Sequence, residues 1–249
     1  MKQLYALIGH PLSHSFSKDF FNRKFREENI DAQYLNFEIK DVGELSQLIE
    51  DYPNLCGINV TIPHKINVIP LLDKLSDDAE TIGAVNVIKI RRKAQEKAVL
   101  EGHNSDITGF KQSLKPLLTN NHTQAIILGT GGASKAVEQG LKQLQLTPLY
   151  VSRTAKNNCI TYEEITKEII ENHTVIVNTT PLGMYPHTEA CPDIPYEYLT
   201  DNHILYDLIY NPAETLFLQK GKAHKATIKN GLEMLHLQAL KAWHIWNLP

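Results

Sequence analysis

The chain has 249 residues, of which 42% are hydrophobic and 21% charged, and its formal net charge is −3. This composition is typical of a globular protein with one large domain or two modest ones. The small negative charge lacks the basic signature of proteins that bind nucleic acids or anionic membranes. The basic cluster at 91–93 lies between two predicted strands and is interpreted as a solvated hairpin tip. We therefore expect neither nucleic acid nor membrane as a partner.

The cysteines and the N-terminal segment indicate the compartment. Cys56, Cys159 and Cys191 share no spacing typical of a metal site or a disulfide framework, and we expect no metal. An odd, scattered set of cysteines fits a reducing environment. The N-terminal segment is apolar for only about six residues, which is too short for a signal peptide core, and no apolar run is long enough to span a bilayer. These features predict a cytoplasmic protein.

Strand-like and helix-like segments alternate through the first hundred residues. Strands are expected at Gln3–Ile8, Gln33–Ile39, Cys56–Ile62, Ala84–Ile90 and Ala98–Gly102, the last two as a hairpin pair. Helices are expected at Ser15–Asn29, Val42–Asp51 and Ile66–Lys74.

The alternation continues beyond Asn104. Helices are expected at Asp106–Leu118, Ala133–Leu144, Tyr162–Glu171, Ala213–Lys222 and Leu232–Trp246. Strands are expected at Ala125–Leu128, Pro148–Ser152, Val175–Thr179, Ile204–Ile209 and Ala226–Ile228. Such alternation predicts an α/β fold with parallel strands. We expect two α/β lobes with a seam near Asn104, and a last helix that folds back over the first lobe.

A glycine-rich loop, GTGGAS at 129–134, follows a short apolar strand and precedes a helix. In a dinucleotide site, Gly129 would allow the tight turn, Gly131 the approach of the backbone to a pyrophosphate, and the helix N-terminus would face the anion. Ser134 replaces the usual third glycine. A plain strand-to-helix turn is the alternative, but the surrounding βαβαβ pattern favours a nucleotide.

The end of the next strand indicates which nucleotide binds. NAD sites usually carry an acidic residue there, which accepts from the ribose hydroxyls. This strand instead ends in Ser152, Arg153 and Thr154, followed by Lys156. An arginine at this point can pair with a 2′-phosphate, so the segment favours NADP over NAD; a solvated turn is the alternative.

Polar side chains end the predicted strands of the first lobe. The stretch NVTIPHK at 59–65 places Asn59, Thr61 and Lys65 at one strand tip, and Asn86 interrupts an apolar strand. Loops after parallel strands converge on one sheet edge, so these groups suit a small, hydroxyl-rich substrate bearing a carboxylate. Each has a structural alternative. Asn86 is either a hydrogen-bonded core amide or a ligand, because a buried amide without partners is costly.

Three further candidates lie at helix starts. Ser13, Ser15 and Asp106 each precede or begin a predicted helix, where Ser and Asp are favoured as caps. Lys65 also opens a helix, where the helix dipole disfavours a cation, so a functional reason for it is favoured.

Together these segments resemble the shikimate dehydrogenase family over nearly the whole chain, and their order and spacing make the resemblance specific. The matching segments are 8–15, 59–65, Gly83–Asn86, Asn104–Asp106 with Gly109, 129–134, Asn178–Met184, Asp207–Pro212, and Gly231–Leu235 leading to Gln238 and Ala239. Departures occur in the run Phe16-Ser17-Lys18, where the family normally has proline next, at Ile107, where it usually has glycine, and at Ser152, where many members have asparagine.

The resemblance implies a fold, a reaction and site residues. The implied fold is α/β in two domains: a substrate-binding domain, 1–103 plus 232–249, and a Rossmann-like NADP-binding domain, 104–231. The implied reaction is reversible, NADP-dependent reduction of 3-dehydroshikimate to shikimate in aromatic amino acid biosynthesis, by a monomer or homodimer. The implied catalytic pair is Lys65 and Asp106. The implied substrate-binding residues are Ser13, Ser15, Asn59, Thr61, Asn86, Asp106, Tyr210 and Gln238. The implied cofactor-binding residues are Gly129, Gly131, Gly132, Ala133, Ser152, Arg153, Thr154, Lys156, Gly231 and Met234.

Three alternatives remain open at this point. A quinate/shikimate dehydrogenase using NAD is disfavoured because no acidic residue follows the second strand of the glycine-loop lobe. A non-catalytic regulator that binds NADP or shikimate would have no need of a proton-transfer pair. A tetrahydrofolate-type dehydrogenase would need an aromatic platform for a pterin, and only Tyr5 and Tyr210 lie near the strand ends.

Overall fold

The structure is a computed structural model that describes residues 2–12, 16–92, 97–154 and 159–248. The chain divides into two compact units: unit 1 comprises residues 1–105 and 239–249, and unit 2 comprises residues 106–238. The boundaries predicted from the sequence fall after residues 103 and 231. No helix in the described ranges is long and apolar enough to cross a membrane.

Unit 1 is built on a mixed sheet with the strand order β2-β1-β3-β5-β6-β4. Its strands are β1 (Gln3–Gly9), β2 (Ala32–Glu38), β3 (Leu55–Val60), β4 (Lys74–Leu75), β5 (Val87–Arg91) and β6 (Val99–His103). The helices of this part of the chain are α1 (Phe16–Glu27), α2 (Glu44–Asp51), α3 (His64–Asn67) and α4 (Asp77–Ile82), with a 3-10 turn at Ile69–Leu71.

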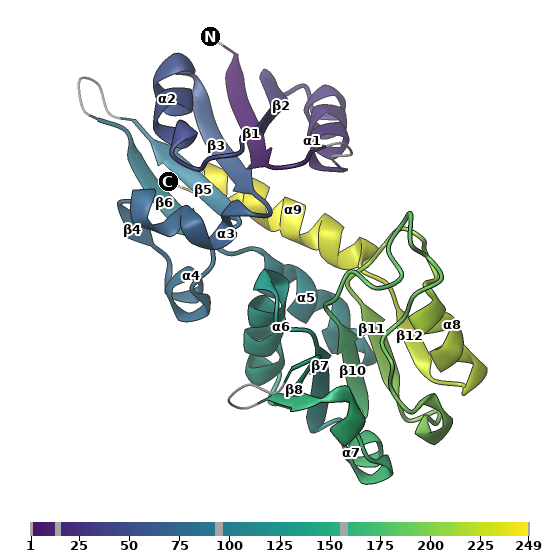
Figure 1. The fold of residues 1–249 in the computed structure, drawn as a ribbon. Helices are drawn as coiled ribbons and strands as arrows, with labels where there is room; N and C mark the ends of the chain where they lie inside the picture. The colour runs from purple at the N-terminus through teal and green to yellow at the C-terminus, as the bar shows by residue number, and fades with distance from the viewer. Residues whose placement is uncertain (1, 13–15, 93–96, 155–158, 249) are drawn as a thin grey trace. The chain divides into compact units, whose positions relative to one another are not determined.

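Two apolar layers cover the sheet of unit 1, whose strands and helices are labelled in Figure 1. One contains Leu45 and Leu48 of α2 with apolar residues of β1 and β3. The other contains Phe21 of α1 and Trp246 of α9 (Leu232–Asn247). The predicted return of the last helix to the first lobe is therefore confirmed.

Unit 2 is built on a parallel sheet with the order β12-β11-β10-β7-β8-β9. Its strands are β7 (Gln124–Leu128), β8 (Thr147–Ser152), β9 (Cys159–Thr161), β10 (Val175–Asn178), β11 (Ile204–Asp207) and β12 (Thr227–Lys229). Helices α5 (Asp106–Leu114) and α6 (Gly132–Gln143) pack on one face, and α7 (Lys167–Asn172) and α8 (Leu216–Ala223) pack on the other. The α/β prediction is confirmed.

Two predicted helices are wrong in part. The one at Ile66–Lys74 is α3, a 3-10 turn and the two-residue strand β4, because Pro70 removes a main-chain donor. The one at Tyr162–Glu171 is a 3-10 turn (Tyr162–Glu164) followed by α7, which begins after its own cap: the Thr166 hydroxyl accepts from the Ile169 N–H at 3.3 Å. Strand β9 and helix α4 were not predicted from the sequence.

Candidate functional site

Unit 2 contains a cavity of about 610 Å³ where β7, β8, β9 and β10 end. This volume is in the range of pockets that hold small ligands and cofactors. Its lining residues are Gly129, Thr130, Gly131, Ser152, Arg153, Thr154, Tyr162, Thr179, Thr180, Pro181 and Leu182. The predicted glycine loop and the predicted nucleotide-selecting segment thus border one cavity.

The glycine turn leaves space for a ligand. Gly129 has φ +98°, and a Cβ there would lie 2.8 Å from Thr180 Cγ2, so this position requires glycine. A Cβ at Gly131 or Gly132 would meet nothing within 4 Å. Ser134, which replaces the third glycine, donates from its hydroxyl to the Gly131 carbonyl at 2.6 Å. The open space at the turn fits the close approach of a pyrophosphate.

Helix α6 begins at this turn without a side-chain cap, because its N-cap residue is Gly131. The first main-chain N–H groups of a helix lack a partner one turn earlier and point toward its N-terminal end, although in α6 the Ser134 N–H donates to the Gly131 carbonyl at 3.1 Å. Together with the helix dipole, they make the start of α6 suitable for an anion. Ala133 is the second residue of this helix.

The described lining of the cavity contains a cation and no carboxylate. Arg153 and Thr154 are exposed beyond the end of β8, and the Thr154 N–H donates to the Ser152 hydroxyl at 3.4 Å. Lys156, the fourth predicted residue of this group, lies outside the described residues. A cation with neighbouring hydroxyl groups fits a phosphate on the ribose, as the sequence predicted.

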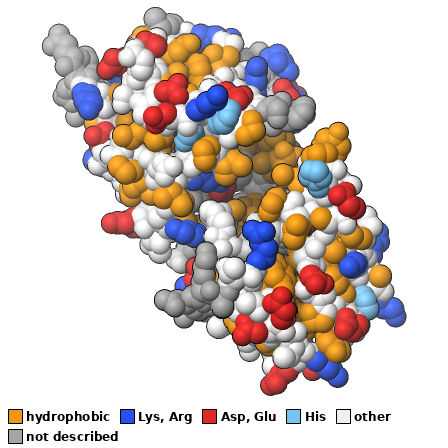
Figure 2. All heavy atoms as spheres, in the orientation of Figure 1, with side chains coloured by type: hydrophobic (Ala, Val, Ile, Leu, Met, Phe, Trp, Pro, Cys, Tyr) orange, Lys and Arg blue, Asp and Glu red, His pale blue; other side chains and the backbone are white. Residues whose placement is uncertain are grey.

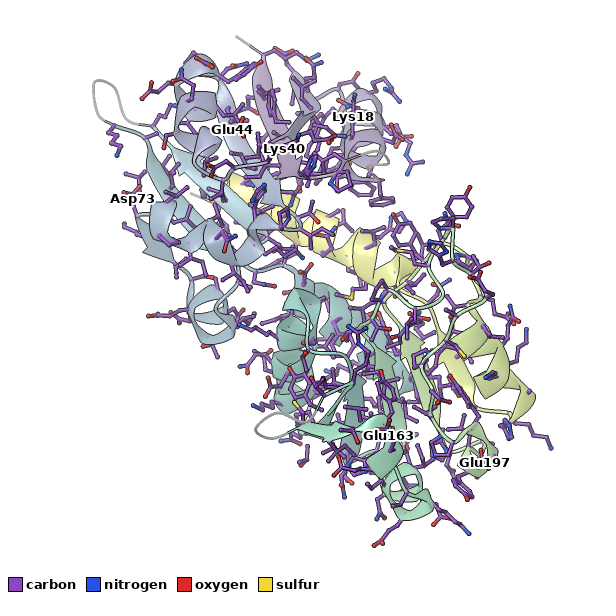
Figure 3. The ribbon with its side chains drawn as sticks, in the orientation of Figure 1. Lys18, Lys40, Glu44, Asp73, Glu163 and Glu197 are labelled. Atoms are coloured by element: carbon purple, nitrogen blue, oxygen red, sulfur yellow. The ribbon has the colours of Figure 1, made fainter. Side chains whose placement is uncertain are left out.

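Tyr162 is a lining residue that was not predicted from the sequence. Strand β9 pairs with β8, with Thr161 beside Ser152, so Tyr162 follows the sheet at the cavity. Figure 3 labels the next residue of this turn, Glu163. Burial raises the pKa of the Tyr162 phenol, and the charge of Arg153 acts in the opposite direction. The run Ile160–Tyr162, which is β-branched and aromatic, is the signal that would have indicated β9.

Unit 1 carries the polar strand ends at one edge of its sheet. Strand β5 runs antiparallel to β3 and β6, so the start of β5 lies beside the ends of those two strands. Asn59 near the end of β3, Asn86 just before β5 and Ser105 just after β6 therefore meet. The main-chain N–H of Val85 also donates to the Lys65 carbonyl at 2.8 Å, which ties α3 to the same edge.

The two asparagines of this edge are buried and mutually oriented. Asn59 is 5% and Asn86 3% exposed. The Asn59 Nδ2 donates to the Asn86 carbonyl at 3.3 Å. The Asn86 Nδ2 donates to Ser105 Oγ at 3.0 Å, and the Ser105 N–H donates to Asn86 Oδ1 at 2.7 Å. Asn86 is thus a hydrogen-bonded core amide, while any ligand role for it stays a prediction.

The remaining predicted residues have varied positions. Thr61 is half-buried beyond β3, and its N–H donates to the Ile8 carbonyl at 2.9 Å. Lys65 belongs to unit 1, and Asp106, 8% exposed, is the first residue of α5 and of unit 2. Their role as a catalytic pair stays a prediction. Ser13 and Ser15 lie outside the described residues.

Four predicted residues lie in the last part of unit 2. Tyr210 is exposed, and the Gln238 Nε2 donates to the Leu235 carbonyl at 3.0 Å. Gly231 allows a close main-chain approach, because a Cβ there would lie 2.0 Å from the Leu208 carbonyl oxygen. Met234 packs in the buried cluster that contains Phe110. None of these four is among the residues that line the described cavity.

Comparison with known proteins gives the family. A family model described as the shikimate dehydrogenase substrate binding domain matches residues 7–88. A shikimate dehydrogenase (NADP(+)) of Clostridium beijerinckii is 39% identical in an alignment that covers 98% of this chain and 92% of that protein. The chain belongs to the shikimate dehydrogenase family.

Solved structures of the shikimate dehydrogenase fold agree with this assignment. A shikimate 5-dehydrogenase of Thermus thermophilus, in complex with NADP(H) and shikimate, is 27% identical with a TM-score of 0.85, covering 98% of this chain and 93% of that one. A 5-ketofructose reductase of Gluconobacter is 26% identical with a TM-score of 0.82, covering 99% and 93%. Because two different substrates occur on this fold, the substrate must be argued from the site.

Proposed function

We propose that this protein is a cytoplasmic, NADP-dependent shikimate dehydrogenase that reversibly reduces 3-dehydroshikimate to shikimate in aromatic amino acid biosynthesis. The proposal rests on the cavity of unit 2. Its lining contains both the glycine turn and Arg153, and its described lining residues include no carboxylate. The curated relative reported above is named for NADP(+) and shikimate. We assign cofactor binding to unit 2 and most of the substrate contacts to unit 1, with Asp106, Tyr210 and Gln238 of unit 2 as further substrate contacts.

The cofactor would lie along the described cavity. Gly129, Gly131, Gly132 and Ala133 would hold its pyrophosphate at the start of α6, and Ser152, Arg153, Thr154 and Lys156 would hold the 2′-phosphate. Tyr162 would border the adenosine half, since it lines the cavity beside Arg153. Gly231 and Met234 would lie by the nicotinamide. NADPH, when bound, supplies the hydride that reduces the ketone.

The substrate would be held by groups that match its chemistry. Ser13, Ser15 and Tyr210 would bind the carboxylate, and Asn59, Thr61, Asn86, Asp106 and Gln238 would bind the hydroxyl groups. A site built from buried amides and hydroxyls discriminates against analogues that lack a hydroxyl, because its own polar groups would lose their partners. Asn59 and Asn86, both buried, meet this condition.

Lys65 and Asp106 would manage the proton. Reduction of a ketone places a negative charge on the carbonyl oxygen, which must receive a proton from a positioned acid. The Lys65 amine would donate this proton and, in the reverse direction, accept it from the alcohol. Asp106 would bind the reacting hydroxyl and orient it toward the amine.

The function is tested with purified protein, shikimate or quinate, and NADP or NAD. We expect shikimate with NADP to be the preferred pair, read as cofactor reduction at 340 nm, and the replacement Lys65→Ala to lower kcat about 100-fold or more with little change in the KM for NADP. Lys40→Ala is the matched control, because Lys40 is an exposed lysine of the same unit (Figure 3). Faster turnover of quinate with NAD, or normal kcat in Lys65→Ala, would contradict the proposal.

A further inference from the structure

A tyrosine in the core of unit 1 contacts the proposed substrate-binding amide. Tyr34 lies in β2 with no exposed surface, and its hydroxyl donates to Asn59 Oδ1 at 2.7 Å. The Ser17 side chain of α1 is hydrogen bonded to Tyr34. Aromatic rings hold the phenol in place: the Phe21 ring stacks on it with centroids 4.9 Å apart, and the Trp246 ring lies at 6.4 Å. The Tyr34 hydroxyl therefore has a fixed position.

The orientation of the Asn59 amide follows from its two partners. The Asn86 carbonyl can only accept, so the amide end that faces it at 3.3 Å must be Nδ2. Oδ1 consequently faces Tyr34, which must donate. Burial raises the pKa of the Tyr34 phenol well above its ordinary value, so the hydroxyl keeps its proton at any physiological pH.

These contacts define what Asn59 can offer a ligand. Its oxygen accepts from Tyr34, and one hydrogen of Nδ2 is donated to the Asn86 carbonyl. The second hydrogen of Nδ2 is the donor that remains after these two bonds. Asn59 thus presents an N–H group, which suits a substrate hydroxyl oxygen that acts as an acceptor.

We propose that Tyr34 is a positioning residue that holds the Asn59 carboxamide with its remaining N–H toward a hydroxyl of the substrate. This inference rests on the proposed function. Without the phenol, Oδ1 of a buried amide would lose its partner, and the amide could rotate and present its oxygen instead of its nitrogen. A donor would then be missing when the substrate binds.

The replacement Tyr34→Phe tests this inference, because it removes the hydroxyl and keeps the ring. We expect the KM for shikimate to rise about 5- to 20-fold, the effect of one lost hydrogen bond, with the KM for NADP unchanged and kcat within about threefold. Tyr5→Phe is the matched control. Tyr5 is equally buried and packs on Trp246, but its hydroxyl donates to Gln3 at 3.4 Å and is not part of the Asn59 network. Tyr5→Phe should leave the KM for shikimate unchanged.

A double-mutant cycle separates positioning from general stability. In an Asn59→Ala background, adding Tyr34→Phe should cause no further rise in the KM for shikimate, because the amide to be positioned is absent. An unchanged KM in Tyr34→Phe, or an equal rise with and without Asn59, would overturn the inference while wild-type activity remains. A wild type inactive on shikimate would overturn the proposed function instead, and the inference with it.

Discussion

At the scale of single residues, Asn86 shows why the chemistry of a side chain depends on its partners. An amide inside an apolar segment had two interpretations, a core hydrogen bond or a ligand contact. Ser105 supplies partners for both ends of the amide, at 3.0 and 2.7 Å, across a separation of 19 residues. The local sequence contains no signal for such a pairing, because the two residues meet only after β5 and β6 have paired.

Arg153 is expected to determine the choice between NADP and NAD. The replacement Arg153→Asp exchanges a cation for a carboxylate at the end of β8, so it should repel a 2′-phosphate and accept from ribose hydroxyls. We expect the KM for NADP to rise about 10- to 100-fold and the KM for NAD to stay constant or fall. Steady-state kinetics with both cofactors measure this.

The control for Arg153 is Lys167→Asp, an exposed charge reversal in α7 that does not line the cavity. This variant should keep the wild-type ratio of the two KM values. An unchanged ratio in Arg153→Asp would remove the argument for a 2′-phosphate at this position.

Asp207 gives unit 2 a stability that depends on pH. Burial raises the pKa of its carboxyl from 3.8 to about 6, although donors from Thr215, Ile209 and Asn178 act in the opposite direction. The pKa of the Asp207 carboxyl is higher in the folded state than in the unfolded state. The contribution of this group to the free energy of unfolding is therefore complete below about pH 4 and is lost as the pH rises through about 6. The difference between 3.8 and about 6 corresponds to roughly 3 kcal/mol.

The comparison of wild type with Asp207→Asn isolates this effect, because the variant cannot ionise at position 207. We expect the free energy of unfolding of the wild type, relative to the variant, to fall between pH 4 and pH 6. Chemical denaturation at several pH values measures it. A difference that is constant over this range would contradict a raised pKa.

At the scale of elements, segments with a clear apolar pattern were predicted well, and three short segments without one were not. Helix α9 has sixteen residues, and the strands β7, β8 and β10 each contain a run of consecutive apolar residues. In contrast, α3, α4 and β9 have four, six and three residues, too few for a periodic pattern to show. These short elements matter for the site, because α3 carries Lys65 and β9 leads to Tyr162.

The contact of α9 with β3 is a specific test of packing between elements. A Cβ at Gly57 would lie 2.3 Å from Trp246 Cδ1, so Gly57→Ala must displace the indole ring. We expect a loss of about 1–3 kcal/mol in the free energy of unfolding, the usual cost of overpacking a core. Urea unfolding followed by tryptophan fluorescence measures this.

Gly43→Ala is the matched control for Gly57→Ala. Its main chain is right-handed helical at φ −58°, and the nearest atom to a Cβ there is a side-chain oxygen of Asp41 at 3.3 Å. We expect a change within about 0.5 kcal/mol for this exposed site. Equal stability of the two variants would argue against close packing of α9 on β3.

At the scale of the whole molecule, the two units provide complementary chemistry. Unit 1 has buried amides at the strand ends of its sheet, and unit 2 has a helix start without a side-chain cap, which suits an anion. Charges of both signs are interspersed on the face shown in Figure 2, in agreement with the net charge of −3. Recognition of small ligands by specific sites is thus favoured over recognition by a charged face.

Hydrogen exchange tests the assignment of the cofactor to unit 2 and of most substrate contacts to unit 1. NADP alone should slow exchange of the amides in the turn at 129–134 and in α6, because it would bind unit 2. Shikimate alone should slow exchange at the end of β3 and in α3 of unit 1. Mass spectrometry of peptides from the two units gives the comparison. Equal protection of both segments by NADP alone would contradict the assignment.

The sequence by itself determined the α/β class, the glycine turn and the chemical types of most site groups. These follow from interactions within a few residues: apolar periodicity, the freedom of Gly129 and the side chains that follow each strand. Tertiary structure alone decided the partners. Tyr34 and Asn59 are 25 residues apart, and Tyr162 reaches the cavity only because β9 pairs with β8. The reason is physical: propensity acts along the chain, whereas the geometry of a hydrogen bond depends on how distant segments pack.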